Sequence, residues 1–302
     1  MRVLITGGTG FIGRALAYSL LADGYEVIAL SRRPERVRGL PPGVQVVRWD
    51  ARTAEGWGHL AEGAAAIVNL AGESIAGGPW TAERKRRIRD SRVNAGQAVV
   101  AAVQATTSRP SVIVQASAVG YYGPHGDEEV TEEIPPGDDF LARVAVEWEA
   151  STALVEALGV RRVIIRTGLP LSREGGVFPF FLLPFRFFVG GPLGSGRQWL
   201  PWIHIADEIG AIRFLMENEQ AYGPFNLSAP NPVTNAEFSR ILGRVMGRPS
   251  LMRVPAFALR LALGELATLM LSGQRQIPRR LVEMGYRFRF PELEAALRDL
   301  LR

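Results

Sequence analysis

The chain has 302 residues, of which 47% are hydrophobic, and a formal net charge of +5. This length fits one large globular domain with a smaller appended domain. The chain has no cysteine, which excludes disulfides, thiolate catalysis and cysteine-ligated zinc, and we predict no metal site. The most apolar stretches, 177–189 and 254–271, are interrupted by proline or charged residues, so we expect no membrane-spanning segment. The first residues resemble a buried strand rather than a signal peptide, so we expect a cytoplasmic protein.

Basic residues are scattered along the chain, apart from one dense run at 84–89 on a predicted helix. A solvated helix face is the simpler interpretation of that run. Lysine occurs once, as Lys85, and the other 34 of the 35 basic residues are arginine. We therefore expect neither a nucleic acid nor a membrane as a partner, and a basic nucleic-acid binder is only a third hypothesis.

The first half of the chain alternates predicted strands with predicted helices. Strands are expected at 3–6, 26–30, 44–48, 66–70, 112–115 and 162–166, and helices at 12–22, 81–104 and 139–157. This alternation predicts an α/β fold with a Rossmann-type, doubly wound parallel sheet. Ligands bind such sheets beyond the carboxyl ends of the strands.

After residue 171 the sequence becomes rich in glycine, proline and phenylalanine, and then mostly helical. Helices are expected at 235–246, 255–271 and 291–301. Phe178, Phe181, Leu182 and Phe185 have helical spacing, for which core packing is the default interpretation. We predict a Rossmann domain at 1–172, to which residues 203–228 return. A small, mostly helical substrate-covering domain would comprise 173–202 and 229–302.

The segment from residue 2 to residue 13 is the most informative part of the sequence. A β-branched run at 2–6 is followed by Gly7, Gly10 and Gly13 and then by a helical pattern. Such a turn lets the backbone approach a pyrophosphate, and the positive end of the helix meets the phosphate charge. It predicts a dinucleotide site, in which we expect contacts from Gly7, Thr9, Gly10, Phe11, Ile12 and Gly13.

The end of the second predicted strand favours NADP(H) over NAD. It carries Ser31, Arg32 and Arg33, with no carboxylate until Glu35. The serine hydroxyl and the two guanidinium groups suit the extra 2′-phosphate of NADP(H), which a carboxylate would repel. Two solvent-facing arginines in a turn are the alternative.

Residues at the ends of later strands are expected to complete the cofactor site. Asp50 is a candidate acceptor for the adenine amine, and Arg166 is predicted either to contact the cofactor or to be structural. Small residues after the fourth strand would let the backbone pass the cofactor; these are Asn69, Leu70, Ala71 and Gly72.

Taken together, Thr6 to Gly13, Asp50, Asn69 to Gly72 and Ser117 resemble the extended short-chain dehydrogenase/reductase superfamily. More closely, the chain resembles the nucleoside-diphosphate-sugar epimerase-like branch. Members of that branch are called "epimerase family" proteins and are sometimes labelled cell-division-inhibitor-like. The matching stretches run the whole length, at 69–75, 117–123, 148–149, 166–168, 190–199, 202–207 and 274–281.

The resemblance fails at the residues that would carry the usual chemistry. In the superfamily a tyrosine moves the proton, a lysine four residues later assists it, and a serine orients the substrate. Ser117 matches the serine, but the other two positions fall near Phe140 and Val144. The single Lys85 is preceded at four residues by Thr81, so no Tyr-x-x-x-Lys exists. The standard mechanism is therefore excluded.

Other polar residues are candidates for catalysis beside Ser117. Tyr121 and Tyr122 follow it closely, and either hydroxyl would serve as an acid if an arginine lowered its pKa. Glu73, directly after the small residues of the fourth strand, is a candidate base, with a surface acid as the alternative.

Residues further along are candidates for substrate binding. Arg197 and Trp199 lie in a glycine-rich stretch and suit an anionic or planar group. His204 and Asp207 are three residues apart at a predicted helix start, so they can share one face. Helix capping or a buried hydrogen bond is an equally good interpretation of His204, and a first-turn helix carboxylate of Asp207.

These observations favour an NADP(H)-dependent oxidoreductase or epimerase acting on a small polar substrate, with nucleotide sugars as one possibility. The alternative is a non-catalytic NADP(H)-binding redox sensor or regulatory protein, because such a protein would keep the cofactor loop and lose the Tyr/Lys pair. Two long predicted helices, at 81–104 and 139–157, would suit the homodimer bundle that is common in this superfamily.

Overall fold

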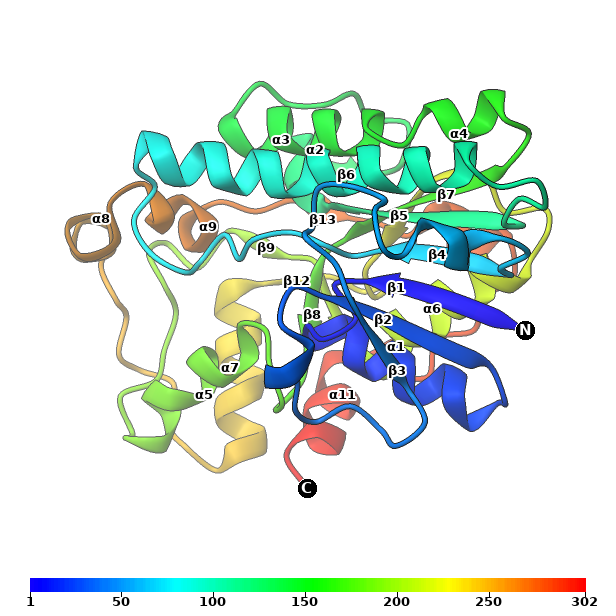
Figure 1. Cartoon of the computed structure of the whole chain (residues 1–302). Helices are drawn as coiled ribbons and strands as arrows, with labels where there is room; N and C mark the ends of the chain where they lie inside the picture. The colour runs from blue at the N-terminus through cyan, green and yellow to red at the C-terminus, as the bar shows by residue number, and fades with distance from the viewer.

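The computed structural model describes all 302 residues. A seven-stranded sheet crosses the molecule, with every strand parallel and the order β11-β7-β5-β4-β1-β2-β3 (Figure 1). This is the predicted Rossmann-type sheet. Its strands are β1 (Arg2–Thr6), β2 (Glu26–Ser31), β3 (Gln45–Arg48), β4 (Ala66–Asn69), β5 (Val112–Ala118), β7 (Arg161–Thr167) and β11 (Gly223–Leu227).

Helices cover both faces of the sheet, as Figure 1 shows. On one face lie α2 (Ala82–Gln104), α3 (Phe140–Ala150) and α4 (Leu154–Ala157), and on the other α1 (Phe11–Ala22) and α6 (Ile205–Glu217). Along β1, Val3 and Ile5 belong to the core beneath α1 and α6, while Leu4 belongs to the core beneath α2. Successive strand side chains point to opposite faces. An apolar run such as β1 therefore fits a sheet that is covered on both sides.

Two of the long helices begin at a side chain that caps them. Thr81 accepts a hydrogen bond from the amide of Arg84 at the start of α2, and Asp139 accepts one from Ala142 at the start of α3. Such caps satisfy amides that have no partner within the helix. Short 3₁₀ turns complete this half of the chain, at Pro34–Arg36, Gly58–Ala61 and Val119–Tyr122.

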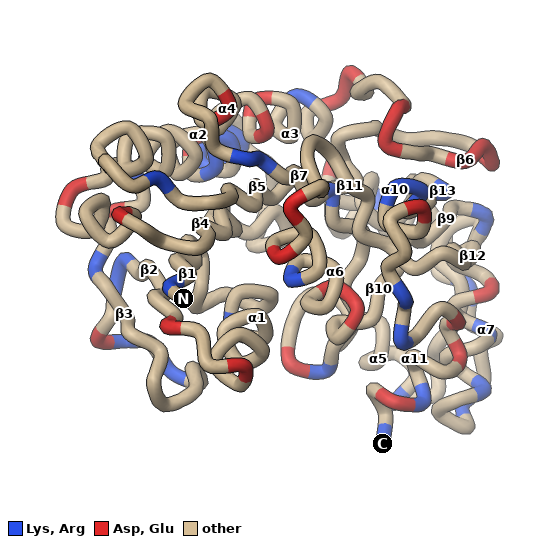
Figure 2. The backbone as a smooth tube through the Cα atoms, turned by 90° about the vertical axis from the view of Figure 1, so that its right-hand side faces the viewer, with Lys and Arg blue, Asp and Glu red and all other residues tan.

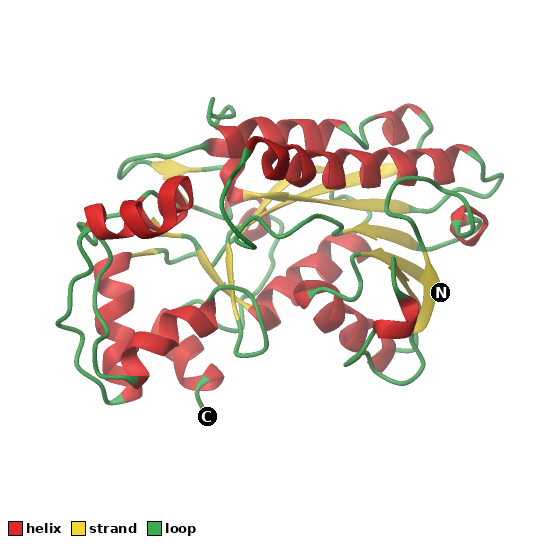
Figure 3. Cartoon of the chain, turned by 60° about the vertical axis from the view of Figure 1, so that its left-hand side comes forward, coloured by secondary structure: helices red, strands yellow, loops and turns green.

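The remaining elements form a mostly helical region beside the sheet (Figure 3). Its helices are α5 (Phe178–Arg186), α7 (Asn235–Met246), α8 (Ala256–Leu263), α9 (Thr268–Leu271), α10 (Arg279–Glu283) and α11 (Leu293–Leu300). Three short strand pairs connect it: β8 (Leu169–Leu171) with β10 (Trp202–His204), β9 (Trp199–Leu200) with β12 (Val233–Thr234), and β6 (Glu129–Val130) with β13 (Arg275–Gln276). None of the helices is long and apolar enough to cross a lipid bilayer.

Packing confirms the predicted role of the phenylalanine stripe. Phe178, Leu182 and Phe185 are buried in a core cluster with residues of α7 and α11, and Phe181 packs against it from a half-buried position. These four positions have the spacing that directs side chains to one side of α5.

Two predicted helices are interrupted, which corrects their expected bounds. The helix expected at 139–157 divides into α3 and α4. The helix expected at 255–271 divides at Gly264, whose φ of +58° leaves the helical region, and a 3₁₀ turn at Gly264–Ala267 separates α8 from α9. A glycine adopts this backbone conformation with little strain.

Charged residues are mixed in sign over the surface. Figure 2 shows acidic and basic positions interspersed along the visible side, with no continuous basic stripe across it. The dense basic run at 84–89 is held largely by ion pairs, including Lys85 with Glu265 and Arg89 with Glu147. This agrees with the interpretation of that run as a helix face.

Candidate functional site

The glycine turn between β1 and α1 is built by close backbone contacts. Gly7 has a φ of +66°, and a Cβ there would lie 2.9 Å from the carbonyl group of Leu70. A Cβ on Gly13 would lie 2.5 Å from the carbonyl oxygen of Gly7 and 2.7 Å from the Cα of Gly8. Only glycine fits these two positions, because real Cβ atoms do not approach other atoms so closely. Helix α1 consequently starts directly against the end of β1.

The amino end of α1 is open to an anionic ligand. Its N-cap residue, Gly10, has no side chain to accept from the first turn, and no acidic residue lies in that turn. The amides of Phe11, Ile12 and Gly13 make no backbone hydrogen bond. Free amides and the positive end of the helix dipole together attract phosphate. The turn therefore fits the pyrophosphate of a dinucleotide.

At the end of β2 lie two arginines that form no ion pair within the chain. Arg32 and Arg33 are exposed, and neither forms an ion pair within the chain. The nearest acid, Glu35, is directed to Arg48, with 3.0 Å between its Oε2 and the guanidinium Nη2. Ser31 is buried, and its Oγ accepts a hydrogen bond from the Arg33 amide at 3.3 Å. The two guanidinium groups are thus available for a 2′-phosphate.

Two other predicted cofactor residues are engaged within the chain. Asp50 accepts hydrogen bonds from the amides of Arg52 and Thr53, so its carboxylate organises the turn after β3. The buried Asn69 side chain accepts from Thr6 at 2.5 Å and donates to Gln115 at 2.8 Å, which links β1, β4 and β5. A cofactor contact from the Asn69 region would come from the backbone of Asn69, Leu70, Ala71 and Gly72, and that contact stays a prediction.

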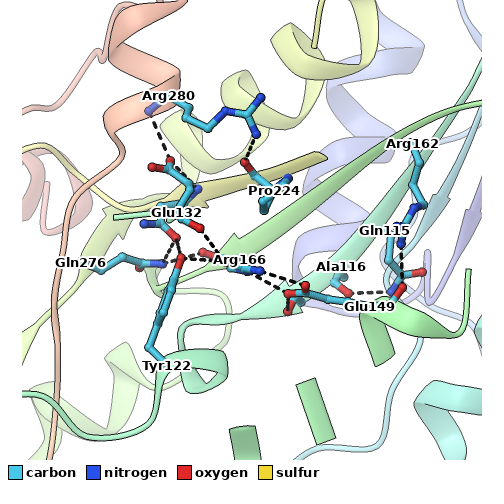
Figure 4. A network of polar contacts seen from close by, with 12 residues as sticks. Gln115, Ala116, Tyr122, Glu132, Glu149, Arg162, Arg166, Pro224, Gln276 and Arg280 are labelled. Carbon is cyan, nitrogen blue, oxygen red and sulfur yellow. Dashed lines mark hydrogen bonds and ion pairs between the residues drawn. The ribbon is translucent and has the colours of Figure 1, made fainter. Parts of the chain in front are cut away.

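Ser117 lies in a buried polar network at the carboxyl end of β5 (Figure 4 shows most of its members). Its hydroxyl donates to Oε1 of Glu149, from α3, at 2.6 Å. Glu149 in turn accepts two hydrogen bonds from Arg166, from Nε at 2.9 Å and from Nη2 at 3.0 Å. Ser117 and Arg166 are paired in register on β5 and β7, so their side chains lie on the same face of the sheet.

Glu149 is the residue of this network that sequence reasoning missed. The stretch 148–149 belongs to the family resemblance, but the sequence indicates no role for the Glu149 carboxylate. Its partner Ser117 lies 32 residues earlier, in a different element. The local sequence therefore contains no pattern that predicts their contact.

The two adjacent tyrosines occupy different environments. Tyr122 is buried, donates to Asn226 at 2.7 Å and accepts from Arg166 at 3.0 Å. Burial raises the pKa of Tyr122 to about 12, which disfavours it as a proton donor at neutral pH. Tyr121 is half-buried, its ring centre lies 3.5 Å from the Arg166 guanidinium carbon, and its hydroxyl makes no hydrogen bond within the chain.

Arg166 uses its donors inside the protein. Besides the two bonds to Glu149, its Nη1 donates to the Tyr122 hydroxyl and to the carbonyl oxygen of Glu132, at 3.0 and 3.2 Å. The Arg166 residue as a whole is 4% exposed. This geometry favours the structural alternative for Arg166 over direct contact with a cofactor.

Glu73 is held by the arginines of α2. Its carboxylate forms ion pairs with Arg84 at 3.3 Å and Arg87 at 3.5 Å, and its carbonyl oxygen accepts from Arg92 at 3.0 Å. These contacts anchor the loop between β4 and α2. They give Glu73 a structural task in addition to its predicted role as a base.

The predicted substrate residues differ in exposure. Arg197 is exposed, and Trp199 is half-buried with its indole donating to Asp127 at 2.9 Å. His204 is 3% exposed and caps α6, its Nδ1 accepting from the Ala206 amide at 3.0 Å. This is the capping role that the sequence left open, and it disfavours contact between His204 and a substrate.

Asp207 is likewise occupied within the chain, although its spacing to His204 suggested a shared face. It is 1% exposed and accepts hydrogen bonds from the amides of Arg289 and Phe290. It therefore ties the C-terminal segment to α6.

Comparison with known proteins agrees with this geometry. A model of the NAD dependent epimerase/dehydratase family matches residues 3–228, and a domain of unknown function (DUF1731) matches residues 254–300. The chain is 38% identical to the human epimerase family protein SDR39U1, over 100% of both proteins. It is 39% identical to epimerase family protein YfhF of Bacillus subtilis, over 100% of this chain and 98% of that protein.

Solved structures extend the comparison. A crystal structure of human SDR39U1 (isoform2) with NADPH matches with a TM-score of 0.89 at 38% identity, covering 99% of each chain. A UDP-glucose 4-epimerase of Thermotoga maritima, solved with UDP-glucose, matches with a TM-score of 0.82 at 16% identity, covering 100% of this chain and 97% of that one. Because the sequence identity of the second match is only 16%, it shows a similarity of fold alone.

Proposed function

Because the chain belongs to the NAD-dependent epimerase/dehydratase family, we propose that it is an NADP(H)-dependent oxidoreductase or epimerase acting on a small polar substrate. The observation that carries the proposal is the open glycine turn beside two unpaired arginines, Arg32 and Arg33. The similar human protein was crystallised with NADPH. When bound, the nicotinamide supplies or accepts a hydride; the chain has to hold the cofactor, orient the substrate and move a proton.

The choice of cofactor tests the first part of the proposal. Replacing Arg32 and Arg33 together with alanine should weaken NADPH binding by about ten-fold or more, since hydrogen bonds to charged groups are worth about 1.5–3 kcal/mol. NADH binding should stay unchanged, because NADH has no 2′-phosphate. Calorimetric titration of both nucleotides measures the difference.

The exposed Arg240 on α7 provides the matched control, because it too is an arginine without an ion pair but lies outside the glycine turn and the end of β2. Arg240→Ala should bind NADPH as the wild type does. Equal losses for NADPH and NADH in the double variant would remove the assigned role of the two arginines.

For the proton step we propose Tyr121, with Ser117 as the hydroxyl that orients the substrate. The Tyr121 hydroxyl makes no hydrogen bond within the chain, and the centre of its ring lies 3.5 Å from the guanidinium carbon of Arg166. Ser117 directs its own proton to Glu149, so its lone pairs are free to accept a hydrogen bond from a substrate hydroxyl. Glu149 and Arg166 are positioning residues in this assignment.

Tyr121→Phe should lower the rate of hydride transfer by about a hundred-fold or more, the usual contribution of a general acid or base. Tyr222→Phe is the matched control, because Tyr222 is 69% exposed on the surface. The assay follows deuterium from C4-deuterated NADPH into carbonyl compounds and nucleotide sugars by mass spectrometry. An unchanged rate of deuterium transfer in Tyr121→Phe would show that another residue carries the proton step.

The alternative of a non-catalytic redox sensor has support in one observation, the missing Tyr-x-x-x-Lys pair. Tight NADPH binding together with no deuterium transfer across the panel would favour that alternative. Arg197 and Trp199 remain the proposed substrate contacts, and the homodimer remains a proposal that rests on the neighbouring helices α2 and α3.

A further inference from the structure

Exposed apolar side chains gather on one flank of the helical region. Ten of the sixteen large hydrophobic residues that are exposed lie within residues 180–189 and 251–263, with exposed fractions from 36% for Leu263 to 87% for Leu261. We call this set the apolar flank. Its members are Phe180, Leu183, Phe187, Phe188, Val189, Leu251, Met252, Phe257, Leu261 and Leu263.

The two segments of the apolar flank lie side by side. The Met252 amide donates to the carbonyl of Gly190 at 3.1 Å, and the Val254 amide donates to Pro192 at 3.0 Å. Figures 1 and 3 both place α5 and α8 at the same edge of the molecule, joined by this pair of segments. The segments that carry the exposed side chains therefore run along one edge of the molecule.

Helix α8 carries three of the exposed residues of the apolar flank, Phe257, Leu261 and Leu263. It contains seven apolar residues and one arginine, and none of its residues is buried. A helix that is apolar all round normally lies inside a protein or in a lipid environment. In this structure Ala256, Ala258 and Leu259 are half-buried, and the other residues of α8, among them Phe257 and Leu261, are exposed.

All charged residues in the segments that carry the apolar flank are basic. The apolar flank lies within the longer segments 178–189 and 248–263, which contain no aspartate or glutamate. Their four arginines, Arg186, Arg248, Arg253 and Arg260, are exposed, and none forms an ion pair. Arg248 lies 4.3 Å from the ring centre of Phe188, so cation and aromatic ring meet on the same surface.

We propose that the apolar flank binds the surface of an anionic lipid bilayer. Its phenylalanine and leucine side chains enter the boundary between headgroups and acyl chains, and its arginines pair with lipid phosphates. This mode of binding needs no spanning segment, so it is compatible with the absence of an expected membrane-spanning stretch, but it departs from the expectation of no membrane partner. It is independent of the proposed function.

The positive charge around the apolar flank favours an anionic bilayer over a second copy of the chain as the binding partner. In a two-fold dimer through this surface, the same patch faces itself. The four arginines would then oppose one another, with no carboxylate between them. An anionic lipid surface offers the opposite charge together with an apolar layer.

Sedimentation with lipid vesicles tests the proposal on the full-length protein. We expect binding to vesicles of phosphatidylcholine mixed with phosphatidylglycerol, and weak binding to phosphatidylcholine alone. Raising the salt from about 0.1 M to about 1 M should release the protein, because the Debye length falls from about 10 Å to about 3 Å. Arg253→Gln and Arg260→Gln should each weaken binding by about five-fold.

The apolar contribution is tested with Phe257→Glu/Leu261→Glu, which should weaken vesicle binding by more than about ten-fold. Leu154→Glu/Val282→Glu is the matched control, since these residues are 50% and 51% exposed outside the apolar flank. Thermal melting should be similar in both double variants, because all four positions are exposed. Absent vesicle binding, equal losses in both double variants, or a dimer that Phe257→Glu/Leu261→Glu disrupts would each overturn the proposal.

Discussion

Replacing Arg166 with methionine is expected to destabilise the folded protein by about 3–5 kcal/mol. Arg166 is 4% exposed and pairs with Glu149, which is 9% exposed. The methionine side chain keeps much of the volume but leaves a buried carboxylate without a cation. The hydroxyl of Tyr122 loses a donor at the same time. Urea unfolding followed by circular dichroism measures the loss as a lower midpoint.

A second substitution separates the buried charge from the lost packing. Arg166→Met combined with Glu149→Leu removes both charges, and such double replacements are often neutral. The double variant should therefore recover most of the stability. Arg48→Met, which breaks an exposed pair with Glu35, should change the midpoint little. An Arg166→Met midpoint equal to that of the wild type would show that the pair does not hold this region together.

The sheet was predictable because its residues follow simple rules. Val3, Leu4 and Ile5 form an apolar run that only a strand covered on both faces buries completely, and all three are 0% exposed. The glycine turn was predictable for a related reason. Gly7 and Gly13 lie where a Cβ would collide with the backbone. Because only glycine fits there, these single residues suffice to predict the turn.

The polar network was not predictable, because its contacts join distant elements. Ser117 meets Glu149 only after α3 has packed over β5, and Arg166 reaches both from β7. Tyr121 and Tyr122 are equivalent neighbours in the sequence. A single 3₁₀ turn at Val119–Tyr122 directs Tyr122 to a buried position, 1% exposed, and leaves Tyr121 half-buried.

In the C-terminal half of the chain, too, local sequence patterns did not predict the structure completely. The periodic pattern of 255–271 fits one helix, but Gly264 ends it where the chain turns. His204 has the same local sequence whether it contacts a substrate or caps α6. Packing against Phe290, with ring centres 4.0 Å apart, places it in the second role.

The carboxyl group of Glu208 is expected to make the folded protein less stable as the pH rises. Glu208 lies in the first turn of α6 and is 0% exposed. Its Oε1 accepts from the Thr167 hydroxyl at 2.8 Å, while Oε2 has no hydrogen-bond partner. No ion pair offsets the burial, which raises the pKa of Glu208 from 4.5 to about 8.

The sign of the effect follows from proton binding. Between about pH 4.5 and pH 8 the folded chain keeps a proton on Glu208 that the unfolded chain has released. The contribution of the neutral group is therefore complete below about pH 4.5 and is lost progressively as the pH rises to about 8. Glu208→Gln has a similar shape and no charge, so it lacks this slope. It should exceed the wild type in unfolding free energy by roughly 5 kcal/mol at about pH 9.

Urea unfolding at about pH 5, 7 and 9 measures the slope for both proteins. Glu219→Gln is the control, because Glu219 is exposed after the same helix and should leave the wild-type slope intact. Parallel curves for the wild type and Glu208→Gln would mean that Glu208 ionises at its ordinary pKa in the folded protein. The diverging curves that we expect would instead establish a neutral carboxylic acid at pH 7 against the end of β7, where Thr167 follows the Arg166 of the polar network.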